Sequence, residues 1–286
     1  MLDPVRSSEN PVSRRTVIAA GVLAVGVTEL AACSQSAPTS APLTGSSSRT
    51  GPSGSASASV TSPPAATTRP ASGTTTPAPV VLSTPGPDIR TGPTSMASVA
   101  LTFHGAGDVS LTSAALAIAR EAGAYLTVFA VGQWLAANPQ TGRDLVAAGH
   151  DLGNHTWSHQ PMTALDAAAA GREVEQGANA VAATVGRAGL LFRPSGTPTS
   201  TPTIRAAALA AGYPRCISYD VDPLDYTDPG SSAVQSRTLA AVQPGSIVSL
   251  HLGHQGTVDA LPGILQGLAD KGLAAVTVTR LLTGLA

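Results

Sequence analysis

Short apolar runs alternate with amphipathic stretches along residues 97–286. The runs predict β-strands at 99–103, 125–131, 190–192, 215–220, 246–251 and 274–278. The stretches have apolar residues at helical spacing and predict helices at 111–122, 140–148, 163–185, 202–211, 232–242 and 258–271. Because the strand runs are continuously apolar and alternate with helices, they predict an α/β fold with a parallel sheet covered by helices. We assign Arg172 and Glu173 to a solvated face of the long helix.

Polar side chains gather at one end of the predicted strands. They are His104, His155, Arg193, Asp222, Asp225 and His251, and each follows or closes an extended segment. In a parallel barrel the carboxyl ends of all strands surround one mouth, whereas an open sheet spreads them along an edge. The sequence also lacks a glycine-rich phosphate loop of the dinucleotide-binding type. The pattern therefore favours a barrel, complete or incomplete.

The first 33 residues have the features of an export signal. Ser13, Arg14 and Arg15 resemble the start of a twin-arginine motif, and an apolar run at 17–32 follows them. The run leads into the sequence LAAC, which ends at Cys33 and is typical of bacterial lipoproteins. We expect an exported protein that a lipid on Cys33 anchors to the extracellular face of the cell membrane. The alternative is an uncleaved anchor with an incidental cysteine.

Residues 34–96 have the composition of a linker, because Ser, Thr, Pro, Ala and Gly dominate them. Such a segment cannot bury enough apolar surface to offset the entropy lost on ordering. We predict a disordered stalk here and a single domain at 97–286. The chain has a formal charge of −1 and no basic stripe, so we expect no nucleic-acid partner. We also expect a monomer.

Two histidines, His155 and His159, stand four residues apart. On a helical turn this spacing brings both rings to one side. Neutral imidazoles suit a divalent ion such as zinc, with cobalt and nickel as alternatives. The competing interpretation makes one histidine a surface cap and the other a packing residue. The other polar groups at strand ends favour the metal site.

Four motifs, in order along the chain, resemble those of the NodB-type polysaccharide deacetylases, carbohydrate esterase family 4. They are GNHTWSH at 153–159, RPSG at 193–196, DPLDY at 222–226 and IVSLH at 247–251. The resemblance covers nearly all of 97–286 and implies a distorted (β/α) barrel. It also implies metal-dependent removal of acetyl groups from a cell-wall or other envelope polysaccharide.

The same resemblance implies roles for individual residues. His155 and His159 would hold the metal, and His251 would protonate the departing group while Asp225 orients it. From the residues themselves we expect Arg193 to lie near the base and to keep a neighbouring histidine neutral, and the segment after it is a candidate source of N–H donors for the oxyanion. Two aromatic residues, Trp157 and Tyr226, are candidates to line the sugar site, and the alternative for each is that it simply packs.

The first motif of the family is altered in this chain. The family has TFDDG, whose first Asp is the base and whose second is a metal ligand, and here residues 102–108 read TFHGAGD. His104 therefore stands at the position of the base and Gly105 at that of the ligand. Asp108 could complete the metal site with His104 as base, or His104 could be the third ligand with Asp108 as base.

The altered motif also leaves two other interpretations open. The first is a catalytically inactive member of the fold, a lipoprotein that binds glycans. The second is a different metal hydrolase or isomerase on the same barrel that acts on a small amide.

Overall fold

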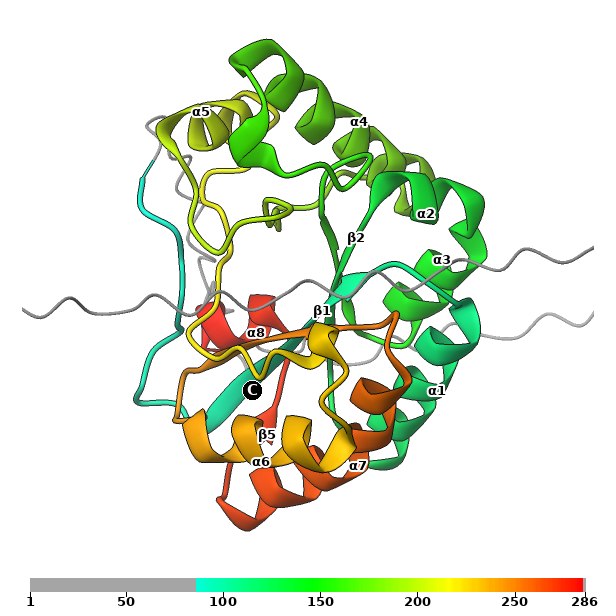
Figure 1. The fold of residues 1–286 in the computed structure, drawn as a ribbon, viewed down its shortest axis with the longest axis vertical. Helices are drawn as coiled ribbons and strands as arrows, with labels where there is room; N and C mark the ends of the chain where they lie inside the picture. The colour runs from blue at the N-terminus through cyan, green and yellow to red at the C-terminus, as the bar shows by residue number, and fades with distance from the viewer. Residues whose placement is uncertain (1–85, 285–286) are drawn as a thin grey trace, which may run out of the picture. The chain divides into compact units, whose positions relative to one another are not determined.

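The computed structural model describes residues 86–284 of the 286-residue chain (Figure 1). The predicted export signal, Cys33 and the linker up to residue 85 lie outside the described residues, so these remain predictions. No helix among the described residues is long and apolar enough to cross a membrane.

A parallel sheet forms the centre of the domain. Its strands are β1 (Ser98–Gly105), β2 (Thr127–Ala130), β3 (Asp151–Asn154), β4 (Ile247–His251) and β5 (Ala274–Ala275). The order is β3-β2-β1-β4, and β5 pairs with the first residues of β1. All of these pairings are parallel, as the continuous apolar runs predict. Since parallel strands end together, His104 and His251 stand side by side in the register of β1 and β4.

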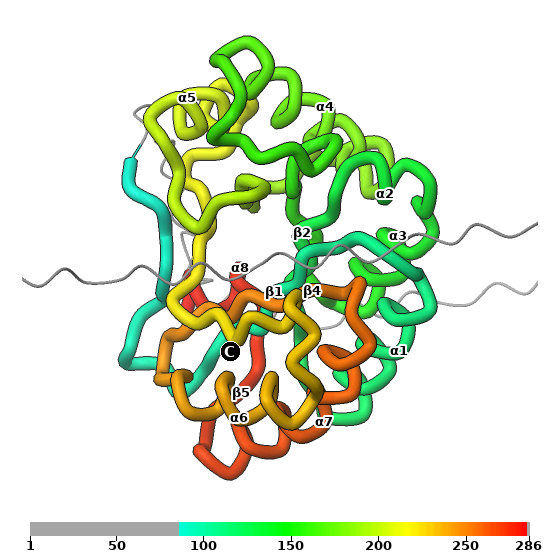
Figure 2. The backbone as a smooth tube through the Cα atoms, in the orientation of Figure 1, coloured from blue at the N-terminus to red at the C-terminus, as the bar shows by residue number. Residues whose placement is uncertain are grey.

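Single backbone bridges connect β3 to β4 on the other side of the domain. Phe192 pairs with Asn154 at the end of β3 and with Cys216, and Val221 pairs with Val248 of β4. Figure 2 shows this chain segment, in yellow, running between α5 and the β4 side of the sheet. The strands predicted at 190–192 and 215–220 are thus reduced to bridges. The result is the distorted (β/α) barrel that the sequence predicted.

Eight α-helices and two 3₁₀ turns surround the strands in the described part of the chain. The helices are α1 (Val109–Glu121), α2 (Gly132–Ala137), α3 (Pro139–Ala147), α4 (Ala167–Val185), α5 (Pro202–Ala210), α6 (Ser231–Ala241), α7 (Gln255–Asp270) and α8 (Val278–Thr283). The turns are η1 (Met162–Ala164) and η2 (Asp225–Thr227). In Figure 1, α6 and α7 lie side by side on one side of the strands, and α4 and α5 lie on the other.

The final predicted strand is shorter than expected. Only 274–275 pairs in the sheet, and the chain then enters α8 at Val278. The Thr277 hydroxyl accepts a hydrogen bond from the Arg280 N–H, and this N-terminal cap starts a helix where the apolar run alone predicted a strand. The short helix α2 was also not predicted.

Alternation along β1 separates the hydrophobic core from the barrel interior. Val99, Leu101 and Phe103 are fully buried in a cluster with side chains of α1 and α7. Thr102 and His104 point the opposite way, because successive side chains of a strand face opposite sides. His104 is therefore aimed into the barrel at its open end.

The folded domain begins before the predicted boundary at residue 97. Ile89 pairs with Ile217, and Thr91 pairs with Ser246 at the start of β4. The Asp88 carboxylate accepts a hydrogen bond of 2.7 Å from the Ser200 N–H. Residues at the end of the predicted linker thus complete the irregular side of the barrel, a role that their Pro- and Gly-rich composition does not reveal.

Candidate active site

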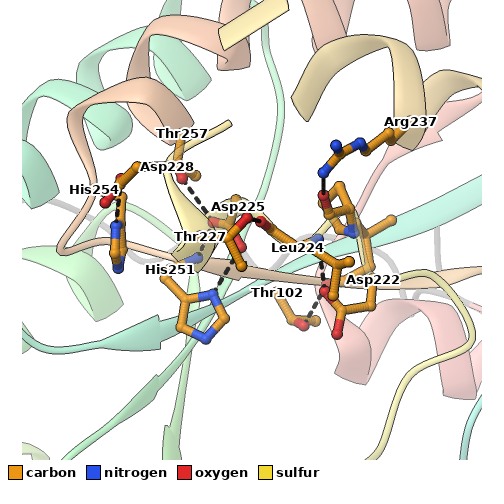
Figure 3. Close-up of polar contacts among 12 residues, drawn as sticks. Thr102, Asp222, Leu224, Asp225, Thr227, Asp228, Arg237, His251, His254 and Thr257 are labelled. Carbon is orange, nitrogen blue, oxygen red and sulfur yellow. Dashed lines mark hydrogen bonds and ion pairs between the residues drawn. The ribbon is translucent and has the colours of Figure 1, made fainter. Parts of the chain in front are cut away.

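A His–Asp pair stands at the carboxyl end of β4 (Figure 3). The Asp225 carboxylate lies 2.8 Å from His251 Nδ1 and also accepts hydrogen bonds from the His251 N–H and the Thr257 hydroxyl. Asp225 is buried, whereas His251 is partly exposed. The carboxylate thus fixes the ring orientation and leaves Nε2 as the nitrogen available to other groups.

Three further histidines form a cluster beside this pair. One ring nitrogen from each of His104, His155 and His159 lies within 4.8 Å of the other two, so the three could hold a metal ion together. The His104 ring centroid is 4.3 Å from that of His155 and 4.3 Å from that of His251. The structure therefore brings residues from β1, β4 and the loop after β3 to one mouth.

The state of the His155 ring can be inferred from its surroundings. Its Nδ1 lies 2.8 Å from the carbonyl oxygen of Arg193, which can only accept a hydrogen bond. Nδ1 therefore carries the proton and Nε2 keeps a free lone pair. Among residues 86–284, the buried Nε2 atoms of His155 and His104 find no hydrogen-bond partner. Unpartnered buried nitrogens beside a third imidazole are the arrangement that a metal ligand set requires.

The loop that carries His155 and His159 is not the helical turn that their spacing suggested. Thr156 has φ 66° and His159 has φ 62°, both in the left-handed region. The Asn154 side chain accepts a hydrogen bond of 2.9 Å from the Thr156 N–H, and the Thr156 hydroxyl donates to that of Ser195. These contacts maintain an irregular backbone, which directs both rings to the same side.

Arg193 lies under the histidine cluster, inside the barrel. Its guanidinium donates hydrogen bonds to the carbonyls of Ile217 and Ser218 and to the Thr102 hydroxyl, at 2.8–3.0 Å. The charge also lies 4.3 Å from the centroid of the Phe129 ring. Burial lowers the pKa of Arg193 to about 9, so the side chain is still charged at neutral pH. The guanidinium thus contacts residues of the barrel wall. Arg193 contacts His155 through its backbone carbonyl.

Burial makes the ligand candidates poor proton carriers. It lowers the pKa of His104 and of His155 well below the usual value for histidine, and neighbouring His155 and Arg193 add to the effect on His104. The pKa of His159 is also lowered, first by the partial burial of its ring and then by His251, while Glu173 opposes this shift. Neutral rings are the form that binds a metal ion.

The structure does not bring Asp108 into the cluster. Its exposed carboxylate caps α1 by accepting a hydrogen bond of 2.8 Å from the Ser110 N–H, and this bond lowers its pKa. Gly105 leaves no room for a side chain, because a Cβ atom there would lie 2.6 Å from Val128 Cγ1 and 3.1 Å from Ala130 Cα. The geometry matches one half of the second predicted arrangement, in which His104 joins the ligand set, but not its other half, in which Asp108 is the base.

A cavity of about 290 Å³ opens in front of the histidines. Its lining includes His104, His159, Tyr219, Asp222, Tyr226 and His251. Tyr226 is 47% exposed and lies 5.2 Å from the His251 ring, where it could contact a sugar. Trp157 does not line this cavity and packs against Gly132 instead.

Two acidic side chains near the site had no role assigned to them from the sequence, although Asp222 was one of the polar residues at the strand ends. Asp222 is the carboxylate in the cavity lining, and its Oδ1 accepts a hydrogen bond of 2.9 Å from the Leu224 N–H. Glu173, assigned to a solvated face, is buried and accepts hydrogen bonds from Trp157 and Ser158. The sequence did hold a signal for this burial, because Glu173 lies at helical spacing from Ala170, Val174 and Gly177 on the buried face of α4.

A second His–Asp pair lies next to the first. His254 Nδ1 is 2.8 Å from Asp228 Oδ1, and the His254 ring centroid is 6.0 Å from that of His251. Figure 3 shows the two pairs next to each other. The outer pair is more exposed and is not part of the cavity lining.

The fold and the site together define a class: a parallel α/β barrel with a histidine cluster and a His–Asp pair at the carboxyl ends of its strands. A family model described as "Polysaccharide deacetylase" matches residues 91–215. A peptidoglycan-N-acetylglucosamine deacetylase of Bacillus cereus is 30% identical over 188 residues, which cover 64% of this chain and 87% of that protein.

Solved structures show the same fold. A family 4 carbohydrate esterase from Streptomyces lividans, in complex with acetate, is 31% identical with a TM-score of 0.58, over 62% of this chain and 91% of that chain. A family 4 pseudoenzyme from Bacillus anthracis is 22% identical with a TM-score of 0.65, over 69% of each chain. This second likeness shows the fold alone. The chain belongs to the polysaccharide deacetylase family, carbohydrate esterase family 4, and is a hydrolase of that class.

Proposed function

We propose that the protein is an exported lipoprotein that removes acetyl groups from an envelope polysaccharide, with peptidoglycan as the substrate class. The observation that carries the proposal is the convergence of the three histidine nitrogens with the His251–Asp225 pair at one cavity. The similarity to a peptidoglycan deacetylase supports the choice of substrate. The predicted lipid on Cys33 would hold the domain near the cell wall.

His104, His155 and His159 are the proposed ligands of a divalent ion. Three neutral imidazoles suit zinc best among common ions, with cobalt and nickel as alternatives. The unpartnered Nε2 atoms of His104 and His155 support this fit. A bound ion would lower the pKa of water and polarise the acetyl carbonyl, which are the two requirements for hydrolysis of an amide.

His251 is the proposed general acid. In its charged form Nδ1 donates to Asp225 and Nε2 points its proton at the cavity, where the departing amine needs one. The buried Asp225 carboxylate holds the ring in the orientation that directs Nε2 at the cavity. Tyr226, next to His251, would contact the sugar.

The proton of the attacking water needs an acceptor other than Asp108, whose carboxylate caps a helix. We assign this role to Asp222, the carboxylate in the cavity lining. Asp222 also acts electrostatically on the buried Arg193. With this assignment His104 acts as a ligand, and Asp222 supplies the base that the altered first motif lacks.

Metal analysis and an acetate assay test the proposal. The purified protein should hold about one zinc ion or similar ion per chain, and it should release acetate from an acetylated chito-oligomer. Asp222→Asn should abolish acetate release without loss of metal, whereas Asp220→Asn is a control, because Asp220 accepts bonds from Ser246 and Ile247 outside the cavity lining. Anchoring is tested by labelling cells with a lipid probe, with Cys33→Ala as the unlabelled control.

The rival function is a glycan-binding lipoprotein without catalysis. The feature that favours it is the loss of both carboxylates at positions 104 and 105. Glycan binding with no bound metal and no acetate release would establish the rival. The rival would be excluded if the protein bound metal and released acetate, and if His155→Ala abolished the metal binding.

A further inference from the structure

We infer that Glu173 is a positioning residue that sets the orientation of the metal-binding loop, and of His159 above all. The inference rests on the proposed metal site for its role, but the contacts themselves do not depend on the ion. Glu173 lies on α4, outside the cavity lining and outside the cluster of histidines.

The Glu173 carboxylate accepts three hydrogen bonds from the segment between the two histidines. Oε2 accepts from the N–H groups of Trp157 and Ser158 at 3.0 and 2.8 Å, and Oε1 accepts from the Ser158 hydroxyl at 2.6 Å. Glu173 is only 7% exposed, so water does not offer an equal substitute for these bonds. A charged acceptor in such a setting makes shorter and stronger hydrogen bonds than a neutral one.

The loop needs such a support because its backbone is strained on both sides of the contact. Thr156 and His159 both have positive φ, and a non-glycine residue in that region costs on the order of 1 kcal/mol or more. Conformations of this kind persist only where the surrounding structure fixes them. Glu173 binds the two residues that lie between the strained positions.

A second contact from the same helix fixes the start of the loop. The Asn154 side chain donates a hydrogen bond of 2.9 Å to the Val174 carbonyl, and Gly177 has no Cβ because the Asn154 side chain and the Thr156 backbone fill that space. One face of α4 therefore supports the loop at successive turns. Glu173 contributes the turn closest to His159.

The two histidines depend on different supports. His155 is oriented by the Arg193 carbonyl, which belongs to another segment of the barrel. His159 is exposed, and its ring has no hydrogen bond among the described residues that would fix it in the same way. Loss of Glu173 should therefore free His159 and leave His155 in place, so that metal binding weakens without disappearing.

The test compares Glu173→Gln with Glu175→Gln, a matched change two residues along on the exposed face of the same helix. Zinc affinity of the purified protein is measured by competition with a chromophoric chelator. We expect Glu173→Gln to bind zinc about 10–100-fold more weakly, the range found when a group that orients a ligand is lost. Glu175→Gln should bind within about twofold of the unchanged protein, since its side chain is exposed.

Two further measurements separate positioning from general stability. At saturating zinc, Glu173→Gln should recover most of its acetate release, whereas a catalytic defect would persist. The melting temperature of the metal-free protein should fall much less than the zinc affinity. Equal zinc affinity for the two variants would overturn the inference, as would a loss of affinity explained by unfolding. Should Glu173→Gln not fold, Glu173→Asp, which keeps the charge but is shorter, takes its place in the same comparison.

A readout without metal keeps this inference distinct from the proposed function. Hydrogen exchange of the Trp157 and Ser158 amides is measured in the metal-free protein. Exchange should be faster in Glu173→Gln and unchanged in Glu175→Gln, and unchanged rates in both would overturn the inference. If the unchanged protein bound no zinc at all, the proposed function would fail, while faster exchange would still show that Glu173 holds the loop.

Discussion

His251 and the His104–His155–His159 cluster lie side by side at the end of the barrel, and His251 and His155 differ in what holds their Nδ1 atoms. On the β4 side, Nδ1 of His251 meets the Asp225 carboxylate. On the β3 side, Nδ1 of His155 meets the neutral carbonyl of Arg193, and the charged guanidinium of that residue lies below. Burial and the neighbouring His159 and Arg193 charges favour the neutral form of His155 over the opposing effect of the Arg193 carbonyl. At His251 the carboxylate accepts a hydrogen bond from Nδ1 and fixes the orientation of the ring.

The difference assigns opposite tasks to one residue type. In the proposed mechanism the neutral rings offer lone pairs to a metal ion, and the ring beside the carboxylate gives a proton to the leaving group. Histidine side chains a few ångströms apart thus take different proposed roles because their surroundings differ.

The largest expected effect comes from His155→Ala on the neutral side. The substitution removes a buried ligand nitrogen, so bound metal should be lost and acetate release should fall to the background rate, because the ion would supply both the activated water and the polarisation of the carbonyl. Metal content and acetate release are measured on the same samples. Full metal occupancy in this variant would show that the cluster is not the binding site.

His251→Ala should affect the opposite side alone. Loss of the general acid should lower the turnover number by about 10²–10⁴-fold, and the metal content should stay unchanged. Element analysis beside steady-state kinetics measures both. A variant that loses metal together with activity would contradict the division of tasks between the two sides.

His104→Ala tests whether position 104 now belongs to the ligand set. We expect zinc affinity to fall by at least about tenfold, because one of three ligands is lost. If neither zinc affinity nor acetate release changed in this variant, His104 would be neither ligand nor base.

Gly105→Asp tests whether the missing carboxylate can simply be restored. Because a Cβ atom would crowd Val128 and the backbone of Ala130, we expect the free energy of unfolding to fall by about 1–3 kcal/mol, with no gain in activity. Urea unfolding measures the first quantity. Gly171→Asp, where no atom lies near the added Cβ, is the control for a new carboxylate.

The smallest effect is the pH dependence of the metal-free protein. The pKa values of His104 and His155 are held below the value near 6.5 of an unfolded chain. Below about pH 6.5 the unfolded chain therefore binds protons that the folded one excludes, and the free energy of unfolding should fall as the pH is lowered towards the folded-state values. Above that pH these groups should contribute no slope. Urea midpoints should fall less steeply in His104→Ala, and an equal slope would contradict the assignment.

More of the fold than of the candidate site could be predicted from the sequence. Apolar runs and strand-end polar residues predicted the parallel barrel, because burial on both faces leaves a clear pattern. They could not predict that 190–192 and 215–220 form bridges rather than ladders, since pairing length depends on the curvature of the whole barrel. The sequence also could not decide whether Asp108 or His104 is the third ligand, because an aspartate that caps a helix and one that binds a metal look alike in a sequence. The role of Glu173 depends on a loop conformation with left-handed residues, which side-chain spacing does not encode.

Arg193 joins the two halves of the domain where backbone pairing is sparse. Its guanidinium connects β1, through Thr102, to the carbonyls at 217 and 218 on the irregular side, and its own carbonyl sets the tautomer of His155. The backbone carbonyl would remain in any variant at this position, whereas the bonds between the two sides of the barrel depend on the guanidinium itself. The side chain of Arg193 thus serves the closure of the barrel, and its main chain serves the orientation of His155.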